Sequence, residues 1–346
     1  METICLPLAP SHRARLVSAG YRTLDSFNNL SPLDLARDIG VSSEEALDIL
    51  KVAWRTKAID GNSPKGANLL AGAKTAWDLL CEEKTMKRIV TFCEDLDVIL
   101  GGGICRKEVT EVGGVPGIGK TQLGIQLAIN VQIPVDLGGL GGQAIYIDTE
   151  GSFMVERVCQ IAKACIEKLK DIPCTSERKV EECHTKLKVD DFLSNIFYFR
   201  ACNYTEQIAV INYMDKFIEE RDKVKIIIVD SVTFHFRQDF EDLALRTRLL
   251  GGMSQKLMRL AEEYDTAVVL MNQVTTKFSG GSFQLALALG ESWSHACTNR
   301  VVLYWNGDNR FGYIDKSPSL QSASAPFSIT TGGICNLERN KRIKMA

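Results

Sequence analysis

The spacing of apolar residues differs between the first part of this chain and the rest, and this difference predicts two structural regions. From residue 9 to about residue 55, apolar positions recur every three or four residues, as is typical of short amphipathic helices. Gly20 and Gly40 stand where helices should stop, and Ser31 and Ser42 stand where the next ones should start. This pattern predicts a small all-helical unit that would be only marginally stable alone.

A segment rich in glycine, proline and asparagine follows at 59–70 and predicts a linker. Ala71–Leu80 then reads as an apolar stretch that leads into a helix, followed by charged residues from Glu82 to Arg88. We expect four parts. They are a helical domain at 1–58, a linker and docking segment at 59–85, a large core at 86–335 and a basic tail at 336–346.

From Ile89 onward the rhythm changes to short, continuous apolar runs separated by helical patterns. The expected strands are Glu108–Val112, Ala144–Ile147, Ile196–Phe199, Lys225–Val229, Ala267–Met271 and Arg300–Trp305. The expected helices are Thr121–Val131, Val155–Leu169, Tyr204–Glu220 and Leu243–Glu263. Buried strands that alternate with helices predict an α/β core, a mostly parallel sheet flanked by helices.

Composition narrows the class of protein. The chain has 346 residues, is 45% hydrophobic and carries a formal net charge of −2, which excludes a wholly disordered chain. No run of about 18 apolar residues predicts a membrane span, and Glu2 disfavours a signal peptide. The eleven cysteines form no CxxC pair, which favours reduced thiols in a cytosolic or nuclear protein. Because the net charge is near zero, any nucleic-acid binding must come from local basic patches.

One motif carries specific chemistry. The pattern G-x-x-x-x-G-K-[ST] follows a predicted strand and opens a predicted helix, as a P-loop requires. Its residues, with the next one along, are Gly114, Val115, Pro116, Gly117, Ile118, Gly119, Lys120, Thr121 and Gln122. The glycines allow backbone N–H groups to cradle phosphate, Lys120 can reach the β- and γ-phosphates, and the Thr121 hydroxyl can ligate Mg²⁺. The sequence therefore predicts ATP and Mg²⁺ as ligands.

Acidic and amide residues end three of the predicted strands. Asp230 follows four buried-strand residues, at the edge where α/β proteins bind ligands, and is the second candidate for holding Mg²⁺. Glu150 is the candidate base for activating water, beside Asp148. Asn272-Gln273 ends a later strand, and an amide there could sense the γ-phosphate. From spacing alone, simple loop capping explains Glu150 and the amides equally well.

Taken together, these residues resemble the RecA-like recombinases of eukaryotes and archaea. The P-loop, Asp148–Phe153, Ile228–Ser231 and Asn272–Val274 occur in that family's order and spacing. The resemblance implies a RecA-like P-loop ATPase core preceded by a helix-hairpin-helix N-terminal domain. It also implies Glu150 as the water-activating carboxylate, Gln273 as a γ-phosphate sensor coupled to DNA, and Arg157 as a side chain stacking on adenine, with a solvated surface arginine as the alternative.

Other segments resemble, more narrowly, the paralogue branch of the family and its C-type members. These segments are Met154–Arg157, Phe234–Arg237 and Glu291–Trp293. The family's phenylalanine-containing docking tetrapeptide would lie near Ala71–Lys74, where phenylalanine is absent, so self-polymerisation through that motif is not expected. The resemblance implies hetero-oligomeric complexes with other paralogues (the B, D and X-ray-cross-complementing types) and with the recombinase itself, on single-stranded or branched DNA such as Holliday junctions.

Two loops are candidates for DNA contact. The first, around Arg237–Arg248, offers three arginines near Phe234 and Phe236, and the second, Val274–Gly290, offers Lys277 and Phe278. Cationic and aromatic side chains in flexible loops suit single-stranded DNA. The arginine candidates are Arg237, Arg246 and Arg248. Solvation of a helix by Arg246 and Arg248, and a core position for Phe236 and Phe240, are the alternatives.

Two further basic features have open interpretations. Lys316, where the strand-exchange proteins would have aspartate, is either a solvated lysine or a cation that reaches a neighbour's γ-phosphate across a subunit interface. The basic cluster Arg339–Lys344 is either a solvated terminus or a nuclear localisation signal. We expect a nuclear protein with a possible cytoplasmic pool.

Two functional hypotheses follow. In the first, the chain is a DNA-dependent ATPase subunit that loads or stabilises recombinase during homologous recombination repair of DNA breaks. In the second, ATP is mainly an assembly ligand with little turnover, and the chain is an adaptor. A helicase or signalling ATPase with the same core is a weaker third reading.

Overall fold

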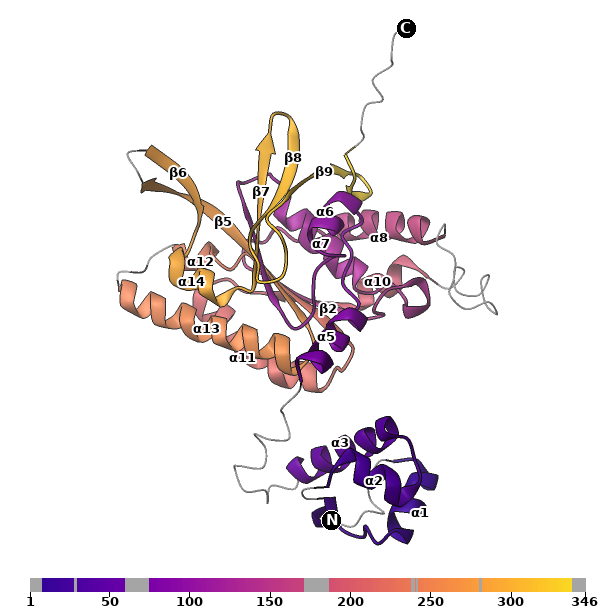
Figure 1. Cartoon of the computed structure of the whole chain (residues 1–346). Helices are drawn as coiled ribbons and strands as arrows, with labels where there is room; N and C mark the ends of the chain where they lie inside the picture. Colours follow the sequence, from indigo (N-terminus) through magenta and orange to yellow (C-terminus); the bar gives the residue numbers. More distant parts are fainter. Residues whose placement is uncertain are drawn as a thin grey trace. The chain divides into compact units, whose positions relative to one another are not determined.

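The computed structural model describes residues 8–27, 30–59, 75–170, 187–237, 240, 242–279 and 282–337 (Figure 1). The chain divides into two compact units, Met1–Thr85 and Met86–Ala346, which are considered separately below. None of the described helices combines the length and apolar character needed to cross a lipid bilayer.

The first unit is helical, as its apolar rhythm predicts. Its elements are α1 (Pro10–Ser18), η2 (Leu24–Phe27), α2 (Pro32–Ile39), α3 (Ser43–Ile59) and α5 (Ala76–Thr85). Ser31 caps α2 by accepting a hydrogen bond from the Asp34 amide, and Gly40 ends this helix in the left-handed conformation, at φ 65°. Leu16, Phe27 and other apolar side chains of α1 to α3 form one small buried cluster. Helix α3 continues to Ile59, one residue past the expected end of this domain.

Helix α5 begins within the stretch Ala71–Leu80, which was expected to lead into a helix. The described helix begins at Ala76, and none of its residues is buried. Thr75 caps it by accepting a hydrogen bond from the Asp78 amide at 3.1 Å, so the cap begins the helix. The expected linker at 60–70 and the docking tetrapeptide position Ala71–Lys74 lie outside the described residues.

The core is built on one twisted sheet (Figure 1). Its order is β10-β9-β8-β7-β1-β5-β4-β2-β3, with β6 paired to β5 outside this path. Strands β7, β1, β5, β4, β2 and β3 run parallel to one another, which confirms the mostly parallel sheet. The strands are β1 (Val109–Gly114), β2 (Gln143–Asp148), β3 (Ile196–Arg200), β4 (Val224–Asp230), β5 (Ala267–Ser279), β6 (Ser282–Leu287), β7 (Asn299–Asn306), β8 (Asn309–Lys316), β9 (Ser324–Thr330) and β10 (Gly333–Cys335).

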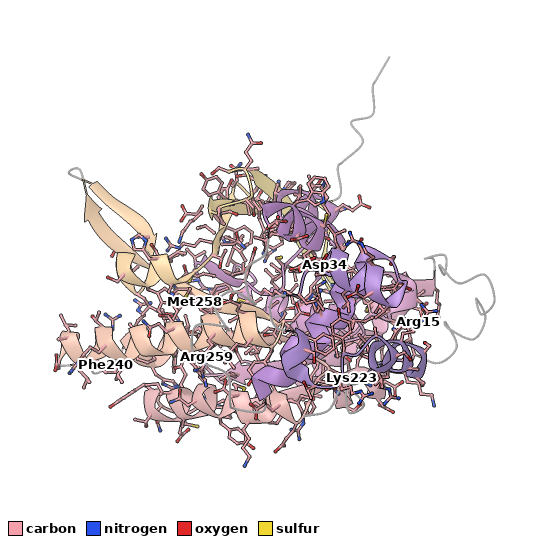
Figure 2. The ribbon with its side chains drawn as sticks, turned by 60° about the horizontal axis from the view of Figure 1, so that its bottom comes forward. Arg15, Asp34, Lys223, Phe240, Met258 and Arg259 are labelled. Carbon is pink, nitrogen blue, oxygen red and sulfur yellow. The ribbon has the colours of Figure 1, made fainter. Side chains whose placement is uncertain are left out.

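Helices cover both faces of this sheet. The core helices are α6 (Glu94–Ile99), α7 (Lys120–Asn130), η3 (Val135–Leu137), α8 (Val155–Lys170), α10 (Val189–Ser194), α11 (Tyr204–Glu219), α12 (Phe234–Arg237), α13 (Leu243–Glu263) and α14 (Gly290–Ala296). Helix α7 packs on one face beside α8, and α13 packs on the other beside α11. Figure 2 labels Arg259 on α13. This arginine pairs with Asp215 of α11 at 3.0 Å.

The strand residues explain why both faces are covered. In β4, Ile226 and Ile228 join the apolar cluster under α7, whereas Ile227 and Val229 join the cluster under α13. Successive side chains of a strand point to opposite faces, so a continuous apolar run requires two helical layers. At roughly 1.5–3 kcal/mol for each large buried apolar side chain, these two clusters are the main stabilising contribution to the core.

Three features differ from the sequence-based expectations. Strand β3 is an edge strand rather than a fully buried one, with Tyr198 45% exposed. The expected flexible loop Val274–Gly290 is largely an antiparallel hairpin, because β5 extends to Ser279 and pairs with β6. Beyond β7 the sheet continues with the antiparallel strands β8, β9 and β10.

Candidate nucleotide-binding and catalytic site

The P-loop lies between the end of β1 and the start of α7, at the carboxyl edge of the parallel strands. Gly119 begins α7 in a left-handed conformation, at φ 115°, and no side chain caps this helix end. A Cβ atom at Gly119 would come within 2.3 Å of the Ile329 side chain of β9. Only glycine tolerates both the positive φ and the lack of space for a Cβ atom at this position. Because no side chain caps the helix, the backbone amides at the start of α7 remain available to an anion.

Lys120 is half-buried, and its ammonium group lies inside the P-loop. It donates hydrogen bonds to the carbonyl oxygens of Gly114 and Val115, at 2.8 and 3.1 Å. Burial lowers the pKa of this ammonium group, and the nearby carboxylates of Asp230 and Glu150 oppose that shift. The three charged groups predicted to serve one site therefore lie within electrostatic reach of one another.

Asp230 and Thr121 are directly bonded. The Thr121 hydroxyl donates to Asp230 Oδ2 at 2.7 Å, and the Tyr146 hydroxyl donates to the same oxygen at 2.8 Å. Asp230 is 2% exposed, and burial raises the pKa of its carboxyl group while these two donors oppose that change. Burial and Asp230 together hold the pKa of Tyr146 well above its usual range, so this phenol stays a donor. Thr121 and Asp230 form the hydroxyl and carboxylate pair expected of a Mg²⁺ site.

Glu150 stands at the centre of a second group of contacts. Its Oε1 accepts hydrogen bonds from the Ser231 hydroxyl at 2.6 Å and from the Gln273 side-chain amide at 2.8 Å. The Gln273 carbonyl oxygen in turn accepts a hydrogen bond from Arg237 at 2.7 Å. The chain thus brings Glu150, Gln273 and Arg237, which are predicted separately from sequence, into one connected network.

Asp148 has a different role from its neighbour. This fully buried carboxylate accepts hydrogen bonds from the backbone amides of Glu150, Gly151 and Phe153, at 3.0, 2.7 and 3.2 Å. Arg200 of β3 lies 3.5 Å from it. Asp148 therefore organises the turn that presents Glu150, a role that sequence reasoning did not assign to it.

Arg157 projects from the first turn of α8 towards the P-loop helix. Its guanidinium donates to Gln122 Oε1 at 2.6 Å and to the backbone carbonyls of Thr330 and Thr331, both at 2.6 Å. These bonds tie α8 to α7 and to the turn between β9 and β10. They fix the guanidinium plane beside the P-loop helix, and its stacking on adenine stays a prediction.

A buried polar cluster beneath the P-loop was missed by sequence reasoning. Glu111 of β1 is fully buried and accepts hydrogen bonds from Asn272, Trp293 and Arg300. Asn272 therefore points away from Gln273, as neighbouring residues in a strand do, which leaves Gln273 as the amide that contacts Glu150. An acidic residue between Thr110 and Val112 of an expected buried strand was the available signal.

The structure separates the candidate DNA-contact residues. Arg237 is exposed at the end of α12, while Arg246 is half-buried on α13 and donates to the Phe236 carbonyl at 2.7 Å. Arg248 is exposed on α13. Phe236 is buried and Phe240 packs against the same cluster, as the core alternative holds. The backbone of Lys277 and Phe278 lies in the β5–β6 hairpin.

Lys316 ends β8, and its ammonium group donates to the carbonyls of Ser294 and Cys297, both at 2.8 Å. These carbonyls lie at the C-terminal end of α14, so the cation caps a helix within its own chain. Its role across a subunit interface stays a prediction. The basic cluster Arg339–Lys344 lies outside the described residues.

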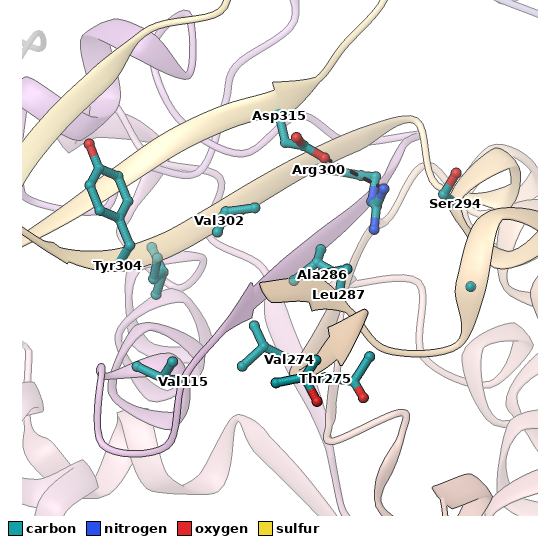
Figure 3. Close-up of a pocket in the computed structure, with 13 residues that line it drawn as sticks. Val115, Val274, Thr275, Ala286, Leu287, Ser294, Arg300, Val302, Tyr304 and Asp315 are labelled. Carbon is teal, nitrogen blue, oxygen red and sulfur yellow. Dashed lines mark ion pairs between the residues drawn. The ribbon is translucent and has the colours of Figure 1, made fainter. Parts of the chain in front are cut away.

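A cavity of about 540 Å³ opens between the β5–β6 hairpin and β7, next to Val115 of the P-loop (Figure 3). Its walls are largely apolar, and Arg300 pairs with Asp315 at one end, at 3.5 Å. The cavity separates the hairpin that was expected to be a DNA loop from the strands beyond the P-loop.

The fold and the P-loop define a RecA-type nucleotide-binding core: a parallel sheet, a P-loop after β1, and a carboxylate at the end of β4. Comparison with protein families specifies it further. The chain matches the Rad51 family model over residues 82–171 and 176–337, and it belongs to that family.

Three curated relatives extend the match. The chain is 44% identical to the DNA repair protein RAD51 homolog 3 of Cricetulus griseus over 335 residues, which is 96% of this chain and 91% of that protein. It is 44% identical to the Dictyostelium discoideum protein of the same name over 267 residues, 75% of this chain and 68% of that one. It is 35% identical to the DNA repair and recombination protein RadA of Aeropyrum pernix, over 94% of each chain.

Proposed function

We propose that this protein is an ATP-binding subunit of a recombinase-paralogue complex that assists homologous recombination repair of DNA breaks. In this proposal its ATP hydrolysis is slow and depends on DNA and on the complex. The observation that carries the proposal is the position of Glu150. The same edge of the sheet holds this carboxylate, bonded to Ser231 and Gln273, and the P-loop with its Thr121–Asp230 pair.

The residues present fit MgATP. The amides at the start of α7 and Lys120 would hold the phosphates, and Thr121 and Asp230 would hold Mg²⁺, directly or through water. Bound MgATP supplies the phosphoanhydride bond that is cleaved. Glu150 would orient a water molecule and accept its proton, while Gln273 would report the state of the γ-phosphate to the DNA side.

The relatives' names support the repair context, since two are called DNA repair proteins and the third a DNA repair and recombination protein. We therefore propose partners of three kinds. They are other paralogues of the B, D and X-ray-cross-complementing types, the recombinase itself, and single-stranded or branched DNA. This role places the protein in the nucleus, with a possible cytoplasmic pool.

A second candidate function is an adaptor in which ATP mainly fixes a subunit interface. Met154 and Val155, which follow the turn of Glu150, are 61% and 53% exposed. Exposed apolar residues this close to a nucleotide site favour a partner there. In this reading ATP binding would strengthen assembly, and its turnover would be incidental.

Glu150→Gln separates the two functions, because it removes the base and keeps a side chain of the same size. Glu262→Gln, an exposed position on α13, is the matched control. ATP turnover and repair in cells lacking the wild-type protein would be measured for both variants. The proposal predicts that Glu150→Gln abolishes turnover and impairs repair. Normal repair by a variant without turnover would leave the adaptor as the function.

A further inference from the structure

The contacts of Arg237 suggest that this arginine does more than face DNA. Its guanidinium lies 2.7 Å from the Gln273 side-chain carbonyl, while the amide nitrogen of the same side chain lies 2.8 Å from Glu150. Both ends of Gln273 are therefore held, one by a cation and one by a carboxylate. Such an arrangement fixes the orientation of the amide, because turning it over would place two donors face to face.

Backbone hydrogen bonds also connect the segment that leads into α12 to the end of β5. The Gln273 amide N–H donates to the Thr233 hydroxyl at 3.3 Å, and the Val232 N–H donates to the Met271 carbonyl at 3.0 Å. Thr233 and Val232 are fully buried, so the segment that leads into α12 is fixed against the end of β5. Arg237, which ends α12, is by contrast exposed. A buried base with an exposed end allows the guanidinium to change partners without a change in the fold.

A phosphate group of DNA can compete with the Gln273 carbonyl for the Arg237 guanidinium. Arg237 bonds a neutral amide oxygen in the described structure, and a phosphate oxygen is a stronger acceptor for a guanidinium than a neutral carbonyl. An exposed arginine held by a weak acceptor is therefore open to capture by a nucleic-acid backbone.

We propose that Arg237 is a positioning residue that alternates between Gln273 and a phosphate of single-stranded DNA. When DNA captures the guanidinium, the Gln273 side chain loses one of its two anchors, and its hold on Glu150 weakens. When DNA is absent, Arg237 keeps Gln273 on Glu150 and restrains the candidate base. This inference deepens the proposed function, since its effect on turnover rests on Glu150 acting in ATP hydrolysis.

The direct test needs no nucleotide. The full chain would be titrated against a fluorescein-labelled oligothymidylate at fixed ionic strength, and binding followed by fluorescence anisotropy. Gln273→Leu removes both polar ends of the side chain at similar volume, and with them the one side-chain hydrogen bond that Arg237 makes among the described residues. We expect Gln273→Leu to tighten DNA binding roughly three- to tenfold, because an arginine that is bonded for most of the time binds phosphate only in its free fraction.

Arg237→Ala completes a double-mutant cycle. It should weaken DNA binding, and in its background Gln273→Leu should have no effect on affinity. Arg248→Ala, an exposed position on α13, is the comparison, and there the Gln273→Leu effect should persist unchanged. If Gln273→Leu leaves the wild-type affinity unchanged while Arg237→Ala weakens it, Arg237 is a simple DNA contact and the inference is wrong. If Arg237→Ala has no effect on DNA binding, the inference also fails.

A second readout concerns turnover. In the absence of DNA, Arg237→Ala should raise basal ATP hydrolysis several-fold, and adding oligothymidylate should stimulate this variant less than the wild type. Unchanged basal turnover with unchanged stimulation would contradict the inference. A wild-type protein without ATP hydrolysis would instead count against the proposed function, and the nucleotide-free cycle would still decide whether Arg237 changes partners.

Discussion

The nucleotide site has two halves that are built differently. In the phosphate half, Thr121 and Asp230 are bonded to each other, Asp230 is 2% exposed and Lys120 is held by its own loop. In the sensing half, Glu150, Gln273 and Arg237 come from three separate segments and meet near the surface. The first half is fixed by the P-loop and by the buried carboxylate that ends β4, whereas the second depends on a chain of exposed or half-exposed hydrogen bonds.

This difference indicates a division of labour. Buried and mutually bonded groups are costly to rearrange, which suits tight and constant binding of phosphate and metal. Exposed hydrogen bonds exchange readily with water and ligands, which suits a response to DNA. Binding and response should therefore be separable by mutation.

The largest effect should follow Lys120→Ala in the phosphate half. The ammonium group is the only side-chain cation within the described P-loop residues, where it bonds the Gly114 carbonyl. Its loss would remove the charge-assisted contacts to phosphate that the proposed function assigns to it. ATP affinity should fall by about 100-fold, or roughly 2.7 kcal/mol. Isothermal titration with a non-hydrolysable ATP analogue measures it, and Lys163→Ala on the exposed side of α8 should bind like the wild type.

A smaller effect, confined to the sensing half, should follow Asp148→Asn. This change keeps the shape of the side chain but weakens its bonds to the amides that hold the Glu150 turn. Turnover should fall about tenfold, as expected when a catalytic group is slightly misplaced, while ATP affinity stays within about twofold. Steady-state hydrolysis and titration would be compared with Asp190→Asn, an exposed position on α10. Parallel loss of affinity and turnover would show that the two halves are not separate.

The smallest expected effect is that of Tyr146→Phe, which removes one buried hydrogen bond to Asp230. The free energy of unfolding should fall by about 1 kcal/mol, because one donor to a buried carboxylate is lost. Chemical denaturation followed by tryptophan fluorescence measures this change. An increase in stability would mean that the phosphate half is held less tightly than the hydrogen bonds indicate.

Much of the core could be predicted from sequence because its strands and its P-loop are each encoded by a short stretch of consecutive residues. The continuous apolar run Ile226–Val229 requires burial on both faces, and the eight-residue P-loop carries its own geometry. The hairpin of β5 and β6 was missed because Thr275 to Gly281 is rich in polar and small residues, which is typical of loops. Pairing between its two strands supplies the order that the local sequence does not indicate.

The contacts of the sensing half could not be predicted from short stretches of sequence. The bond between Arg237 and Gln273 joins residues 36 positions apart, and the bond between Gln273 and Glu150 spans 123 positions. No spacing rule predicts such contacts, so the resemblance to a family was needed to relate Glu150 to Gln273. The buried bonds from Asn272 and Arg300 to Glu111 were missed for the same reason.

The separation of the two halves is tested most directly by measuring ATP affinity and turnover together for Glu150→Gln. Titration with ATP and single-turnover hydrolysis would use the same protein, assembled with its partners and single-stranded DNA. The account predicts that affinity stays within about threefold of the wild type while hydrolysis falls at least 100-fold, as expected for loss of a general base. A variant that loses affinity and hydrolysis in equal measure, or that hydrolyses ATP at the wild-type rate, would contradict it.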